Sequence, residues 1–213
     1  MTMDSASSIE AEHREFDFTA LSERERYKLM IGTIIPRPIA LVTTVDENGG
    51  FNAAPFSFFN CLSADPPILA IGVENNADMS FKDTGHNIRM TEVFTVNIVS
   101  LAIAEAMHVC GSKYPRGVDE LKEAGLTAMP GTKVASPYIM EAPAAFECRR
   151  HVTLELGKSR QIILGEIIYA HYGAGVVDEN LHVDPAAIDA IARLGGNTCS
   201  TIRDRFDMLT PKL

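Results

Sequence analysis

The sequence predicts a mainly β protein, an antiparallel barrel with short helical insertions. About six or seven segments rich in β-branched and aromatic residues follow one another in hairpin order, and turn residues separate them. Only about three or four short stretches space their apolar residues as a helix does. With 213 residues and 46% apolar composition, the chain is long enough to bury one such core.

The first predicted elements are a short helix and a hairpin. Residues 22–30 have helical spacing, with Ser22 as the N-cap and Glu25 as its capping-box partner. Residues 39–45 and 51–59 are strand-like, and the turn sequence DENGG lies between them. These two segments therefore predict a β-hairpin.

The middle of the chain predicts two more strands, a helical turn and a helix. Residues 66–74 and 92–100 have high β-propensity. The segment between them is polar, and either Asp83 or Thr84 could begin a single helical turn there. Residues 101–111 have apolar residues at helical spacing and end on a glycine, as helices often do.

The second half of the chain continues the sheet. Residues 112–125 predict a loop and a second short helix. Residues 144–157 and 160–173 alternate like a pair of long antiparallel strands joined by a short turn. The sheet therefore resumes after the helical insertions.

A last helix is predicted near the C-terminus. Asp184 is its N-cap, Pro185 occupies its first position, and Gly195 ends it. No interdomain linker separates the predicted elements. The predicted organisation is an N-terminal arm (1–21), one barrel domain (22–205) and a C-terminal tail (206–213).

Charge and hydropathy exclude several classes of partner. Lys and Arg total 19 and Asp and Glu total 28, which gives a net charge of −9, and no basic stripe suited to nucleic acid is found. The apolar stretch 34–45 is interrupted by Pro36 and Pro38 and is shorter than the ~20 residues that cross a bilayer. The first residues are acidic and polar, unlike a signal peptide. We therefore expect a cytoplasmic protein that binds neither nucleic acid nor membrane.

The cysteines are interpreted as buried thiols of a reducing compartment, because free cysteine is usually buried. They form no CxxC pair and have no histidine at metal-ligand spacing, so no metal site is predicted. The four are Cys61, Cys110, Cys148 and Cys199.

The predicted strand 51–59 carries polar and very small residues where a core strand would carry Val or Ile. Asn52 and Ser57 offer hydrogen bonds, and the adjacent Ala53 and Ala54 allow a flat ligand to approach the backbone closely. A small barrel has little interior room, so such a ligand would bind at its outer face, its rim or a subunit interface. A flavin or a dinucleotide fits this description.

A second polar segment, SFKDTGHNI, concentrates hydrogen-bond donors. Ser80, Lys82, Thr84 and Asn87 lie within eight residues of one another. Hydroxyls, an amide and one cation suit a bound phosphate. A capped surface turn with a solvated lysine is the alternative. Neither GxGxxG nor GxxxxGK[ST] is present, so no Rossmann fold or P-loop is predicted.

The blocks PRPIALVTT, NAAPFSFF and KDTxxNI occur in this order, and together they carry a family resemblance. The chain resembles the flavin reductase-like domain, the FMN-binding split barrel of the flavoredoxin type, over about residues 22–200. The resemblance implies an antiparallel, Greek-key-like split barrel. It also implies a homodimer in which each subunit binds FMN non-covalently near the interface.

The resemblance also implies which residues hold the flavin. The isoalloxazine, the ribityl chain and part of the phosphate fall to Thr43, Thr44, Asn52, Ala53, Ala54 and Ser57. The phosphate site is completed by Lys82, Thr84 and Asn87. Arg37 either lies near the flavin or braces the start of its strand. Arg193 either approaches the flavin, from the C-terminal segment or from the other subunit, or ends a helix and compensates its dipole.

Two positions depart from the pattern of the family. Members that use NADH commonly have a histidine where this chain has Arg160, and members of the flavoredoxin type often have a tyrosine near the position of Thr198. The first departure puts nicotinamide use in question, and the second removes a stacking or packing contact.

The resemblance implies an FMN-dependent oxidoreductase that NADH or NADPH reduces and that passes electrons to an acceptor or releases reduced flavin. No catalytic side chain is predicted, because hydride transfer belongs to the flavin. One alternative is a non-enzymatic FMN-binding electron carrier reduced by a protein partner, and another is a dimeric binding module without flavin. An electron-transfer protein or an oxygenase would be the macromolecular partner.

Overall fold

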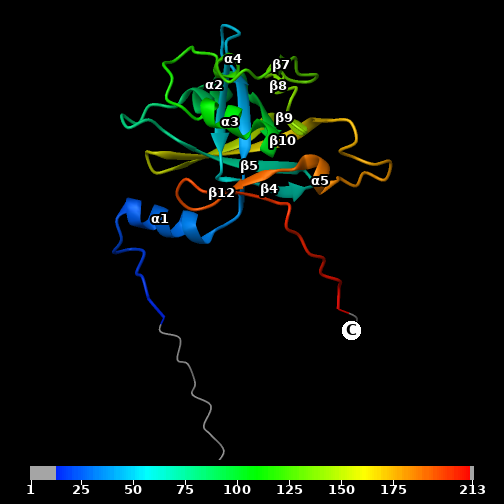
Figure 1. Cartoon of the computed structure of the whole chain (residues 1–213). Helices are drawn as coiled ribbons and strands as arrows, with labels where there is room; N and C mark the ends of the chain where they lie inside the picture. The colour runs from blue at the N-terminus through cyan, green and yellow to red at the C-terminus, as the bar shows by residue number, and fades with distance from the viewer. Residues whose placement is uncertain (1–12, 212–213) are drawn as a thin grey trace, which may run out of the picture.

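The computed structural model describes residues 13–211, which form a mainly β fold with short helices (Figure 1). Seven strands make one antiparallel sheet in the order β3-β2-β6-β9-β10-β5-β4. The first part of the predicted arm, residues 1–12, and the last two residues of the predicted tail lie outside the described residues. The strands are β2 (Ala40–Val45), β3 (Phe51–Phe56), β4 (Phe59–Ala64), β5 (Pro67–Glu74), β6 (Val93–Ile98), β9 (Ala144–Leu156) and β10 (Arg160–Tyr172).

The sheet curls around an apolar interior. Val42 of β2 and Ile71 of β5, which belong to strands far apart in the sheet, are both fully buried in the same cluster. Phe56 of β3 and Phe59 of β4, from the two edge strands, also pack against it. Side chains from both ends of the sheet therefore meet, as the prediction of a barrel requires.

A second apolar cluster covers the outside of the β2–β3 hairpin. It joins Leu41 and Ala53 of the hairpin to Met107 of α3 and Leu121 of α4. The helices α2, α3 and α4 lie on one side of the sheet, and α1 lies on the opposite side (Figure 1). No helix of the described residues is long and apolar enough to cross a membrane. The elements outside the main sheet are α1 (Glu23–Thr33), β1 (Arg37–Pro38), α2 (Asp83–Thr91), η1 (Leu101–Ile103), α3 (Ala104–Cys110), α4 (Glu120–Glu123), β7 (Ala128–Met129), β8 (Tyr138–Ile139), α5 (Pro185–Ile188), β11 (Ile191–Arg193) and β12 (Cys199–Thr201).

Several local predictions are confirmed. The Ser22 hydroxyl accepts a hydrogen bond from the Glu25 N–H, and the Ser22 N–H donates to the Glu25 carboxylate at 2.9 Å, so the capping box of α1 is complete. The β2–β3 hairpin and the long β9–β10 pair form as predicted. The short strands β7 and β8 were not predicted, because two residues give no periodic signal.

The prediction of one strand over 51–59 is wrong. The chain leaves the sheet after Phe56, and β4 begins at Phe59 on the opposite edge of the sheet. Phe58 already accepts a hydrogen bond from the Gly72 N–H of β5. The sequence pattern is continuous because both edge strands send phenylalanines into the same barrel interior.

The predicted helix from Asp184 to Gly195 is also wrong beyond its first turn. The Asp184 carboxylate caps α5 through the Ala186 N–H at 2.8 Å, but α5 ends at Ile188 because Asp189 has a left-handed backbone (φ 41°). The next residues form β11, which pairs with β1 and β12 and buries Ile191. Tertiary pairing of these strands outweighs the local helical pattern.

The segment before β6 forms a nine-residue helix, α2, instead of a single turn. Its Ile88 is fully buried in the barrel interior, so α2 closes one end of the barrel. This long-range packing explains why the helix extends beyond its capping signal.

The prediction that all four cysteines are buried is half correct. Cys110 and Cys148 are buried, and burial raises the pKa of the Cys110 thiol to about 12. Cys61 and Cys199 are exposed, because they lie on strands with few neighbours, β4 at the edge of the main sheet and β12 at the end of the small one.

A buried carboxylate connects β9 to the preceding loop. Glu147 has no exposed surface, and its oxygens accept hydrogen bonds from the backbone N–H groups of Thr132 and Lys133 at 2.6 Å and of Val134 at 3.0 Å. The Nε2 atom of His171 lies 2.6 Å from the same carboxylate. Burial acts to raise the pKa of Glu147, but these hydrogen bonds together hold it below its ordinary value.

Candidate functional site

Four of the predicted flavin residues come together where α2 meets the β2–β3 hairpin. The Asn52 amide donates to the Thr84 hydroxyl at 3.1 Å, and the Asn87 amide donates to the Thr44 hydroxyl at 3.0 Å. Thr44 and Asn52 are opposite each other in the hairpin, and all four side chains are buried. These residues form a polar network that attaches α2 to the barrel.

We expect the Asn87→Ala variant to lower the free energy of unfolding by about 1–3 kcal/mol without any flavin, because the buried Thr44 hydroxyl loses its partner. Urea unfolding followed by circular dichroism measures this change. Met90→Ala, at an exposed position of the same helix, should change stability by no more than about 0.5 kcal/mol. An unchanged midpoint for Asn87→Ala would show that the network adds nothing to the fold.

The N-terminus of α2 is arranged to receive an anion. Lys82 is its N-cap residue, and among the described side chains none caps this end of the helix. The N–H groups of Asp83, Thr84 and Gly85, in the first turn, have no partner within the helix. A helix N-terminus carries partial positive charge and binds phosphate readily. The Lys82 side chain is half-exposed, and its ammonium lies 3.9 Å from the Glu74 carboxylate.

A small hollow beside this helix end limits where a phosphate could bind. It lies between Gly50 in the hairpin turn, Asn52, Asp83 of α2 and Arg116 in the loop before α4. Its volume is about 20 Å³, which holds roughly one water molecule. A phosphate group does not fit within this hollow.

The other residues of the predicted flavin strand divide into buried and accessible positions. Thr43 and Ala53 are fully buried; the Thr43 hydroxyl donates to the Pro137 carbonyl, and the Ala53 N–H donates to the Glu120 carboxylate at 2.9 Å. Ala54 is half-buried, and so is Ser57, just beyond the strand. Of the predicted flavin residues between 43 and 57, only Ala54 and Ser57 offer surface to a ligand.

Glu120 was not singled out in the sequence. Burial is the main cause that raises the pKa of the Glu120 carboxyl group. The carboxylate accepts a hydrogen bond from the Ala53 N–H of the edge strand β3. A glutamate in the first turn of a helix normally complements the helix dipole at the surface, so its residue type gave no signal of this contact.

Arg37 is a brace. Its guanidinium is buried and donates to the carbonyl groups of Ile31 at 2.5 Å, Ile34 at 2.9 Å and Leu194 at 3.0 Å. These contacts join the end of α1 to the C-terminal strands. They agree with the alternative in which this arginine supports the start of its strand.

Arg193 lies beside Arg37 and outside the Thr44 network. It is opposite Arg37 in the β1–β11 pair, so the alternative that it ends a helix is wrong. Arg37 and Arg193 belong to the small three-stranded sheet, whereas Thr44 and Asn52 belong to the seven-stranded sheet. Within the described residues, the Arg193 side chain forms no hydrogen bond with the Thr44 network.

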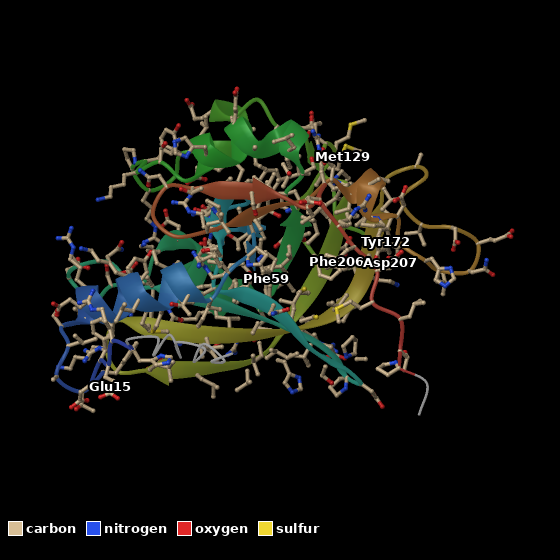
Figure 2. The ribbon with its side chains drawn as sticks, turned by 60° about the horizontal axis from the view of Figure 1, so that its bottom comes forward. Glu15, Phe59, Met129, Tyr172, Phe206 and Asp207 are labelled. Carbon is tan, nitrogen blue, oxygen red and sulfur yellow. The ribbon has the colours of Figure 1, made fainter. Side chains whose placement is uncertain are left out.

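The cavity beside Arg193 has a volume of about 510 Å³. Leu101 and Met107, from η1 and α3, line one side of it, and Ile191 and Ser200, from the C-terminal strands, line the other. Figure 2 shows these orange and red strands running beside the green α3 region. The volume is within the ~300–1,000 Å³ typical of small-molecule sites.

Arg160 is engaged in ion pairs within the chain. Its guanidinium lies 3.1 Å from the Glu23 carboxylate of α1 and 2.8 Å from the Glu74 carboxylate of β5. These contacts attach α1 to the barrel and compensate the arginine charge. Among the described residues, no group of His, Cys, Asp and Glu side chains is placed to hold a metal ion.

Comparison with known proteins gives consistent matches. The family model described as "Flavin reductase like domain" matches residues 31–191. The structure of 2-nitrobenzoate 2-nitroreductase from Pseudomonas fluorescens is 35% identical, covers 93% of this chain and 96% of its own, and has a TM-score of 0.84. The structure of nitrilotriacetate monooxygenase component B from Bacillus cereus is 26% identical, covers 92% of this chain and 99% of its own, and has a TM-score of 0.89. A Shewanella frigidimarina protein described as a flavin reductase with split barrel domain is 22% identical and covers 94% of this chain and 100% of its own. Its TM-score of 0.80 shows that the two proteins have the same fold.

Proposed function

Because this chain belongs to the flavin reductase like domain family and has its split-barrel fold, we propose that it is an FMN-dependent oxidoreductase reduced by NADH or NADPH. The family and its flavin-binding oxidoreductase neighbours support the general activity. FMN, when bound, accepts and donates the hydride. The protein has to hold the flavin, orient it and keep one face of its ring accessible.

The observation that carries the choice of FMN is the uncapped N-terminus of α2 with Lys82 at its N-cap. The first-turn N–H groups and the ammonium together would hold a phosphate with charge-assisted hydrogen bonds. The Thr84 hydroxyl accepts a hydrogen bond from the Asn52 amide, which holds the Thr84 side chain in place in the first turn of this helix. The ring would then extend toward the accessible Ala54 and Ser57, with the buried Thr43, Thr44, Ala53 and Asn87 as the supporting layer.

A homodimer completes this proposal. Tyr27 of α1 and Phe58 beside β4 have ring centroids 6.4 Å apart, and both rings are about half-exposed. Leu62 of β4 and Ile34 at the end of α1 are each 60% exposed. A second copy packed on this apolar surface would bury it. Arg37, which holds the end of α1 to the C-terminal strands, would support the strand that leads to the site.

The acceptor is proposed from the neighbours. The Bacillus cereus protein is named as a component of a monooxygenase, which supports an oxygenase partner that receives reduced flavin. Another electron-transfer protein is the alternative acceptor. The accessible positions of Ala54 and Ser57 are compatible with either exchange or retention of the flavin.

The second candidate function is a non-enzymatic FMN-binding electron carrier. One observation favours it, since Arg160 replaces the histidine common in NADH-using members and is already paired with Glu23 and Glu74. Its charge is therefore compensated before any nucleotide pyrophosphate arrives. A carrier would receive electrons from a protein partner instead.

Anaerobic mixing of the FMN-loaded protein with NADH or NADPH distinguishes the two functions. We expect one nucleotide to bleach the flavin absorbance at a rate near the ~10 s⁻¹ typical of enzymes. Slowing by Arg160→Ala, but not by Arg149→Ala at an exposed ion pair, would assign Arg160 to the nucleotide. Bleaching by dithionite alone would replace the reductase by the carrier.

A further inference from the structure

The cavity beside Arg193 offers an uncompensated positive charge. Within the described chain, no carboxylate forms an ion pair with Arg193, and its one hydrogen bond runs from Nη2 to the Gly196 carbonyl at 2.8 Å. Other arginines of the described chain do pair with carboxylates, namely Arg89, Arg116, Arg149, Arg150, Arg160 and Arg203. The Gly196 contact fixes one edge of the guanidinium and leaves Nε and Nη1 able to donate.

The position of Arg193 is rigidly held. It belongs to β11, which is hydrogen-bonded on both sides by β1 and β12. The two preceding residues, Ile191 and Ala192, are buried. A planar guanidinium on such a strand suits a carboxylate, because two of its N–H groups can donate to the two carboxylate oxygens.

The rest of the cavity is apolar on one side and polar at its rim. Leu101, Ala104, Met107 and Ile191 supply hydrocarbon surface, and Ser200 and Thr201 supply hydroxyl groups near Arg193. In a chain of net charge −9, an anionic ligand is favoured only where a cation is available. An apolar body would fill the hydrocarbon side while the carboxylate meets the guanidinium.

We propose that this cavity binds a small organic monocarboxylate with an apolar body, about the size of benzoate. The site is a second ligand site, because none of the residues that line it belongs to α2 or to the Thr44 network. It goes beyond the proposed flavin chemistry, because a carboxylate can bind there whether or not flavin is present.

Nuclear magnetic resonance of isotopically labelled methionine methyl groups tests the proposal, since Met107 lines the cavity. Titration with benzoate should shift the Met107 signal, assigned by Met107→Leu, with saturation below about 20 mM. Benzamide, which has nearly the same shape and no charge, should bind at least about tenfold more weakly, because the charge-assisted hydrogen bonds are lost. This comparison uses the parent protein and needs no variant to fold.

Arg193→Gln should weaken benzoate binding by at least about tenfold, whereas Arg116→Gln, beside the small hollow at α2, should not change it. Benzoate should also shift Met107 in the FMN-loaded protein. The proposal is overturned by any of three results: no Met107 shift, equal binding of benzamide, or displacement of benzoate by FMN. Displacement of benzoate by FMN would assign the cavity to the flavin itself. If the protein binds no FMN, the proposed flavin function fails, and the benzoate titration of the flavin-free protein still tests the carboxylate site.

Discussion

Replacing Glu147 with alanine lowers the free energy of unfolding by several kcal/mol, because each buried donor left without its acceptor costs about 1–3 kcal/mol. The substitution leaves the N–H groups of Thr132, Lys133 and Val134 without their acceptor and removes the partner of His171. Urea unfolding followed by far-ultraviolet circular dichroism measures the change.

Glu155→Ala is the matched control on the same strand. Glu155 is 62% exposed and pairs with Arg89, so its removal should cost no more than about 1 kcal/mol. Similar losses for the two variants would contradict the assignment of Glu147 as the anchor of this loop.

The pH dependence of Glu147 has a definite sign. Its pKa in the folded protein lies below the ordinary value of 4.5, because the hydrogen bonds to its carboxylate outweigh its burial. Its stabilising contribution is therefore complete above pH 4.5 and is lost as the pH falls through the folded pKa. The stability difference between the parent protein and Glu147→Gln should shrink below pH 4.5, and a constant difference would contradict this.

Replacing Lys82 with alanine weakens FMN binding by about 10–150-fold, equivalent to ~1.5–3 kcal/mol for a hydrogen bond to a charged group. The parent protein should bind FMN with a dissociation constant at or below about 1 μM, and riboflavin much more weakly, because riboflavin has no phosphate. Riboflavin binding should be nearly unchanged by Lys82→Ala. Quenching of flavin fluorescence on titration measures all four affinities.

Lys122→Ala is the control for the loss of a lysine charge. The Lys122 side chain of α4 is 82% exposed and pairs with Asp119, the N-cap residue of that helix, so its removal should leave FMN binding unaltered. Equal affinity of the parent protein for FMN and riboflavin would mean that the phosphate does not bind at the N-terminus of α2. No saturable quenching by either flavin would remove the flavin function itself.

The sequence by itself determined the local elements and the family. The capping box of Ser22 and Glu25, the β2–β3 hairpin and the Asp184 cap depend on residues within a few positions of one another, so their patterns could be interpreted without the fold. The ordered motifs around residues 36–44, 52–59 and 82–88 identified the family for the same reason, since each motif is contiguous. They also selected Thr44, Asn52, Thr84 and Asn87, which the fold brings together.

Only the tertiary structure decided the features that depend on distant partners. Residues 57 and 58 separate two strands on opposite edges of the sheet, and the C-terminal residues 191–193 are a strand because β1 and β12 pair with them. Glu147 is buried because three N–H groups from a loop converge on it, although the sequence shows only an acidic residue in a strand. Long-range hydrogen bonds and burial outweigh local propensity at these positions, and they leave no trace in the spacing of the residues concerned.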